Sequence, residues 1–116
     1  MAVDDPKAID YLGTDDETGV AVLTISDHLD WSSDIESHFW LLAQKICAYM
    51  HFVESGQLAA NLAGRVPRGV EIQIVWAHRP SNQAERFLEV ARESTRSQGI
   101  ELTHKLLPDE YWADRP

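Results

Sequence analysis

The sequence predicts a two-layer α/β sandwich of the α+β type, in which a four-stranded mixed sheet carries two helices on one face. Short apolar runs and longer stretches with helical periodicity alternate along the chain in the order β-β-α-β-α-β. Right-handed crossover connections place both helices on the same face when successive strands advance in one direction. The last two predicted strands have a polar outer face, which fits a sheet that helices cover on one side only. We expect the strand order 1-2-3-4.

We expect one domain spanning residues 1–116, with a loose N-terminus at 1–7 and a C-terminal tail at 108–116. The composition, 44% hydrophobic and 25% charged, is typical of a globular protein. The apolar runs are too short to cross a membrane, and the acidic N-terminus is unlike a signal peptide. The single cysteine, Cys47, excludes an intramolecular disulfide framework. These features predict a cytoplasmic location.

The first two strands are predicted to form a hairpin. Residues 8–12 (AIDYL) place Ile9 and Tyr11 on one face, as in a strand. Residues 13–19 (GTDDETG) are polar and bounded by glycines, which is typical of a hairpin loop. Residues 20–26 are apolar on both faces and therefore predict an interior strand.

A helix is predicted to begin near Ser33, where Ser33 and Glu36 match the S-x-x-E capping box. Asp34 adds negative charge at the positive end of the helix dipole. Gly56 is placed to end the helix, and residues 57–63 could form one further turn. The core-facing stripe recurs at spacings of four and three. Its members are Ile35, Phe39, Leu42, Ile46, Tyr49 and Val53.

The second half of the chain predicts strand, helix and strand. Residues 70–77 alternate cleanly, with Val70, Ile72, Ile74 and Trp76 on one face. Ser81 begins the second helix and Gly99 ends it. The buried stripe of that helix is Ala84, Phe87, Leu88 and Ala91. Residues 100–106 form the last strand, with Ile100, Leu102 and Leu106 inward.

Several segments together resemble a family of small bacterial proteins described as a domain of unknown function. They are Asp5-Pro6, Ile9-Asp10, LTISDHLDW at 23–31, AYMHFVESGQL at 48–58 and VEIQIVW at 70–76. The SDHLDW segment is the most specific part, and the resemblance covers about residues 4–107. It implies a bacterial, cytosolic protein and brings no activity, cofactor or catalytic residue.

The net charge of −9 is concentrated in the first third of the chain. Residues 1–38 contain ten acidic residues and one basic residue, whereas nine acids and nine bases balance in residues 39–116. This field disfavours nucleic acid and anionic membranes and would attract a basic partner such as a toxin. Solubility alone is the other explanation.

The turn between the second strand and the first helix is the main candidate site. Asp27, His28, Asp30 and Asp34 lie close together in sequence, and imidazole with carboxylates can bind a transition metal. Their spacing matches no known metal motif, so we predict no metal and no cofactor. The same acids disfavour a phosphate at this helix start. Aspartate and serine at such a place can equally serve only to cap the helix.

The residues favour a non-catalytic role. His28 beside Asp27 or Asp30 is the nearest acid–base candidate, but no activated nucleophile accompanies it. Cys47 lies on a predicted core face. His38 and His51 are predicted to lie at solvated or boundary positions of the first helix. His104 is predicted to be a hydrogen-bonded core residue.

The tryptophans divide into two groups. Trp76 alternates with core residues, and Trp40 flanks the helix stripe and is expected to be half-buried. Trp31, in the turn, and Trp112, in the tail, are harder to bury. Such aromatics are enriched at interface hot spots, although local packing over a helix end explains them equally well.

Two hypotheses for function follow. The first is a non-catalytic protein-interaction module, either a homodimer that uses the last strand or the tail, or a binder of a basic partner such as a toxin. An edge strand offers unpaired backbone groups to a second copy. The alternative is a small-molecule- or metal-dependent function at the Asp27–Trp31 turn. The candidate binding residues are Asp27, His28, Asp30, Trp31 and Trp112.

Overall fold

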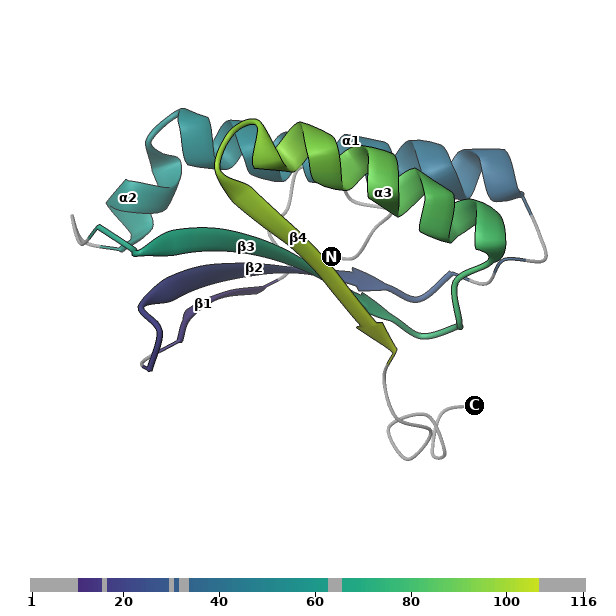
Figure 1. Ribbon diagram of the computed structural model, residues 1–116, viewed down its shortest axis with the longest axis horizontal. Coiled ribbons are helices and arrows are strands. Elements are labelled where there is room, and N and C mark those ends of the chain that lie inside the picture. Colours follow the sequence, from purple (N-terminus) through teal and green to yellow (C-terminus); the bar gives the residue numbers. More distant parts are fainter. Residues whose placement is uncertain (1–10, 16, 30, 32–33, 63–65, 107–116) are drawn as a thin grey trace.

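A computed structural model describes residues 11–15, 17–29, 31, 34–62 and 66–106 of the chain (Figure 1). It contains four strands and three helices in this part. In chain order they are β1 (Tyr11–Thr14), β2 (Val20–Asp27), α1 (Ile35–Glu54), α2 (Gln57–Asn61), β3 (Gly69–Trp76), α3 (Asn82–Arg96) and β4 (Ile100–Leu106).

The predicted fold class is confirmed. The four strands form one mixed sheet in the order β1-β2-β3-β4, as expected. β1 pairs antiparallel with β2, and β2, β3 and β4 run parallel to one another. Figure 1 shows α1 and α3 side by side above one face of the sheet. The extra helical turn expected after Gly56 is α2, and Gly56 itself has the positive φ of 88° that favours glycine.

The first hairpin is confirmed with a shorter loop than predicted. Gly13 and Thr14 belong to β1, where they pair with Val22 and Ala21. The Asp15 carboxylate accepts the backbone N–H of Glu17 at 2.8 Å and so closes the turn. Residues 8–10 of the predicted strand lie outside the described part of the chain. At its other end, β2 extends to Asp27, which pairs with Trp76 of β3.

The predicted Ser33–Glu36 capping box is wrong, because the N-cap of α1 is Asp34. The Asp34 carboxylate accepts the backbone N–H of Ser37 at 3.1 Å and the Ser37 hydroxyl at 2.7 Å. Aspartate caps a helix as well as serine does, so the cap lies one residue later and accepts the N–H of Ser37 instead of that of Glu36. Ser33 itself lies outside the described residues.

Replacing Asp34 with alanine should lower the thermal midpoint, because the N–H of Ser37 loses its acceptor. Asp34→Ser should retain most of the stability, and Glu54→Ala, at the opposite end of α1, serves as the control.

The hydrogen bonds from Ser37 hold the pKa of Asp34 below its ordinary value of 3.8. The stabilisation is therefore present above pH 3.8 and lost as the pH falls through the lowered pKa. Thermal melts at several pH values measure both effects; equal midpoints for wild type and Asp34→Ala at neutral pH would contradict the cap.

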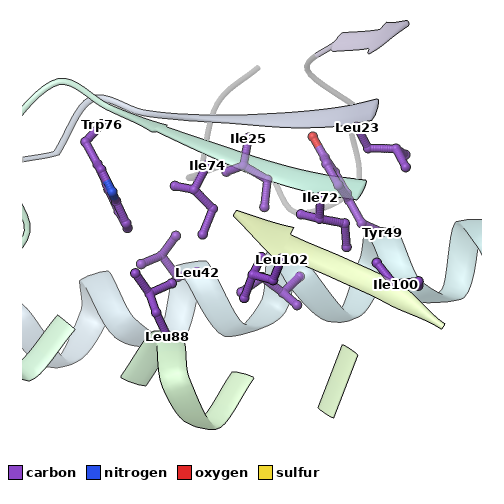
Figure 2. Close-up of a cluster of buried hydrophobic side chains, with 11 residues drawn as sticks. Leu23, Ile25, Leu42, Tyr49, Ile72, Ile74, Trp76, Leu88, Ile100 and Leu102 are labelled. Carbon is purple, nitrogen blue, oxygen red and sulfur yellow. The ribbon is translucent and has the colours of Figure 1, made fainter. Parts of the chain in front are cut away.

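The hydrophobic core lies between the sheet and the helices (Figure 2). Strand residues that point toward the helices meet helix residues that point toward the sheet. The buried members are Leu23, Ile25, Leu42, Ile46, Tyr49, Ile72, Ile74, Trp76, Leu88, Ile100 and Leu102. The Tyr49 hydroxyl donates to the Thr24 carbonyl at 2.8 Å, which fixes α1 against β2 without leaving a buried hydroxyl unsatisfied.

Several burial predictions were wrong. His38 is buried rather than solvated, because it lies on the same helix face as Leu42. Cys47 is exposed rather than core-facing, and Trp40 is more exposed than half-buried, since α3 covers only part of α1. His104 and Leu106 are exposed rather than core, because both lie near the end of the last strand. By contrast, Trp76 is core, as predicted.

Candidate functional site

The predicted turn residues differ in how deeply the structure buries them. Asp27 is only 1% exposed, because it continues the inward alternation of Ala21, Leu23 and Ile25 along β2. His28, the next residue, is exposed, and Trp31 is half-buried. Asp30 and Trp112 lie outside the described residues. A binding role for these side chains stays a prediction.

Asp27 forms a buried pair with a residue that was not among the candidates. The Asp27 Oδ2 lies 2.5 Å from Nε2 of His38, which is 2% exposed. The second carboxylate oxygen, Oδ1, accepts the backbone N–H of Leu29 at 3.0 Å. One hydrogen bond thus links the two side chains, and the tautomer of His38 decides which atom donates. The pair therefore joins the end of β2 to the first turn of α1.

An aromatic cluster covers this pair. The ring of Trp31 stacks on the His38 imidazole, with centroids 3.7 Å apart and an angle of 15° between the planes. Trp31 also meets the rings of Trp76 and Phe39, each at a centroid distance of 5.6 Å. Local packing of Trp31 over the helix end, one of the two explanations considered for it, is what these contacts show.

The Asp27 and His38 side chains form a hydrogen-bonded pair inside the fold. They are 1% and 2% exposed. Within the described part of the chain, no three histidine, cysteine, aspartate or glutamate side chains gather as metal ligands would. The sequence does contain a signal for this pair. Asp27 falls on the alternating positions of β2 that point into the core, and His38 lies on the core-facing side of α1.

A concave region of the surface lies beyond the carboxyl ends of β3 and β4. It is a cleft of about 330 Å³, bounded by the end of Trp76, the start of α3 at Asn82 and the side chain of His104. The indole N–H of Trp76 donates to Nδ1 of His104 at 3.1 Å. Burial lowers the pKa of His104, the nearby Arg92 guanidinium lowers it further, and Glu85 opposes them in part.

The outer face of the helical layer carries an apolar groove between α1 and α3. Its volume is about 210 Å³, and residues of both helices line it. The lining includes Ala43, Cys47, Met50, Phe87, Val90 and Ala91. Val90 is 67% exposed, and Trp40, one helical turn before Ala43, is 59% exposed. Exposed apolar side chains that lie together on a surface are common at protein interaction sites.

The fold and these sites define a small two-layer α+β protein in which one predicted site residue, Asp27, is buried in a pair with His38. The chain belongs to a family of unknown function, DUF6572, whose model matches residues 1–108. The predicted resemblance to an uncharacterised family is thereby confirmed. The bacterial origin of the protein and the role of SDHLDW as the most specific segment of the family stay expectations. No curated protein and no solved structure matches the chain. None of the helices in the described part is long and apolar enough to span a membrane.

Proposed function

We propose that this protein is a non-catalytic interaction module that forms a homodimer through the outer face of α1 and α3. The observation that carries the proposal is the apolar groove between these helices, with Trp40 and Val90 exposed beside it. Docking of a second copy would remove this apolar surface from water. This burial would favour the dimer by roughly 25 cal/mol for each Å² of apolar surface buried.

The composition of this apolar surface supports its use as a protein interface. On α1, Trp40, Ala43 and Cys47 recur at spacings of three and four and so form one stripe along the helix. Phe87 and Val90 of α3 border the groove on its other side. Exposed tryptophan and methionine side chains are enriched at the centres of interfaces.

The positions of two charges on α3 support pairing with a second copy. Arg86, Val90 and Glu93 are exposed and spaced by four and three residues, so they share one helix face. In a two-fold dimer the α3 helices of the two copies can cross antiparallel near Val90. Arg86 of each copy then lies opposite Glu93 of the other.

The edge of the sheet is a less favourable place for this contact than the sequence suggested. β4 is an edge strand, as expected. However, the Arg92 side chain donates from Nε to the Leu102 carbonyl at 3.3 Å, which occupies an acceptor that an added strand would need. The tail beyond Leu106 lies outside the described residues.

Two other hypotheses have weaker support. A basic partner such as a toxin could bind the acidic first third, to which the exposed Asp15, Glu17, Asp34 and Glu36 contribute. A ligand or metal at the Asp27–Trp31 turn would have to compete with the internal hydrogen bonds of Asp27.

Light scattering at several concentrations tests the homodimer. We expect a dimer for the wild type and at least about a tenfold weaker association for Val90→Arg, since a charge is then buried in an apolar contact. Val66→Arg is the matched control, because Val66 is 90% exposed and lies apart from the groove lining. A protein that stays monomeric at about 100 μM, well above the dissociation constant of a specific dimer, would end the proposal and favour a different partner.

The charge arrangement has its own test. Arg86→Glu and Glu93→Arg should each weaken the dimer, because each creates like charges across the interface. The double variant should restore association toward the wild-type value, since the pairs re-form with reversed signs. Failure of the double variant to recover would reject this antiparallel arrangement of α3, while the Val90→Arg result would still report on the helical face.

A further inference from the structure

We propose that the cleft beyond the carboxyl ends of β3 and β4 is a binding site for a small anion that carries a carboxylate or phosphate group. The cleft is separate from the helical face and from the Asp27–His38 pair. Its lining brings together Arg79, Asn82, Glu85, His104 and Lys105. This set offers several hydrogen-bond donors and two permanent positive charges against one acid.

The position of the cleft in the fold supports ligand binding. β2, β3 and β4 are parallel, so their carboxyl ends meet at one edge of the sheet. In open α/β sheets, ligands bind in crevices outside this edge. The loop from Trp76 to the start of α3 forms one wall, and the end of β4 forms the other. The volume of about 330 Å³ is at the lower end of the range for small-molecule sites.

The lining of the cleft has a net positive charge, whereas the whole chain has a net negative charge. The protein carries a net charge of −9, yet Arg79 and Lys105 face Glu85 alone among the charged residues of this cleft. An arginine guanidinium can hold both oxygens of a carboxylate or phosphate at once. Asn82, the first residue of α3, adds a neutral donor group at the positive end of the helix dipole.

His104 is held in the form that can donate to an anion. The indole of Trp76 can only donate, so Nδ1 of His104 must accept and carries no proton. In the neutral imidazole the proton then resides on Nε2, which makes this nitrogen a donor. The core residue Trp76 thus fixes the tautomer of a side chain in the cleft, which is a form of preorganisation.

The start of α1 provides an internal contrast. There the exposed carboxylates of Asp34 and Glu36 occupy the positive end of the helix and would repel an anion. At the start of α3, the cap is the neutral Ser81, whose hydroxyl accepts the Ala84 N–H at 3.1 Å. Each helix has one acid in its first turn, Glu36 in α1 and Glu85 in α3, so the two helix starts differ in the charge of the cap residue.

Titration with inorganic phosphate and with citrate, at constant ionic strength, tests the site. We expect a saturable shift of the Trp76 indole N–H resonance in ¹H–¹⁵N spectra, with a dissociation constant of about 1 mM or tighter for at least one probe. The probe that binds more tightly identifies the preferred group, phosphate or carboxylate. Arg79→Gln should weaken this binding at least about fivefold, since it removes the bidentate contact.

Arg68→Gln is the matched control, because Arg68 is exposed and precedes the opposite end of β3. It should leave the dissociation constant unchanged. His104→Phe removes a donor and should weaken binding while the unfolding midpoint confirms that the variant is folded. No saturable shift with either probe, or equal weakening by Arg79→Gln and Arg68→Gln, would overturn the proposal in favour of diffuse charge attraction.

Discussion

Replacing Asp27 with alanine is expected to lower the free energy of unfolding by about 1–3 kcal/mol, the usual effect of removing a hydrogen-bond partner from a buried polar group. The substitution leaves His38 buried without the carboxylate that lies 2.5 Å from its Nε2, and it also removes the acceptor of the Leu29 N–H. Urea denaturation followed by circular dichroism measures the change.

The neighbouring residue supplies the control for this experiment. His28→Ala alters an exposed side chain and should change stability by no more than about 0.5 kcal/mol. The double variant Asp27→Val/His38→Leu should recover part of the loss, because apolar residues need no hydrogen bonds in the core. A loss below about 1 kcal/mol in Asp27→Ala would contradict the view that this pair joins β2 to α1.

Ile74→Ala is the second substitution with a large expected effect, a loss of about 2–5 kcal/mol through the cavity it creates. Ile74 is fully buried on β3, in the cluster that contains Leu42 and Leu88 of the two long helices (Figure 2). Neither helix can move inward to fill the space without separating from the rest of the sheet. Chemical denaturation again measures the loss.

Val66→Ala is the matched control for Ile74→Ala, since it also shortens a β-branched aliphatic residue. Val66 is almost fully exposed in the segment before β3, so the free energy of unfolding should change by no more than about 0.5 kcal/mol. Similar losses for the two variants would mean that Ile74 is less tightly packed than the structure indicates.

The fold could be predicted because its signals are local. The alternation along residues 70–77 and the turn chemistry of residues 13–19 each specify an element without knowledge of the rest of the chain. Right-handed crossovers predicted that both long helices cover one face of the sheet, whereas the expected strand order had no signal of its own in the sequence. The N-cap of α1 was misplaced because Ser33 and Asp34 are both good caps, and only the geometry distinguishes them.

The Asp27–His38 pair was missed because its evidence is divided between two elements. Asp27 was interpreted as a turn residue, although its position in β2 has the inward parity of Ile25. His38 was interpreted as solvated, although it lies four residues before Leu42 on the core-facing side. Each polar residue at an inward position needs a partner, but eleven residues separate the two in sequence. Only the packing of α1 on β2 brings them together.

The exposed positions on α1 could not be predicted for a different reason. Leu41, Ala43, Cys47 and Met50 widen the apolar stripe, so the sequence indicates a helix that is apolar over most of its circumference. How much of it is covered depends on where α3 lies. Because α3 leaves the groove beside Cys47 open, residues that resemble core in sequence form a surface in the structure.

The burial of Lys45 has a consequence for chemical labelling. This lysine is fully buried in the middle of α1, with its Nζ 5.5 Å from the centre of the Tyr49 ring. An amine-reactive reagent in the solvent reaches that nitrogen only when the structure around it opens. The chain has three lysines, and Lys105 is exposed on β4. The rate at which Lys45 is acylated relative to Lys105 therefore reports how often the protein opens under native conditions.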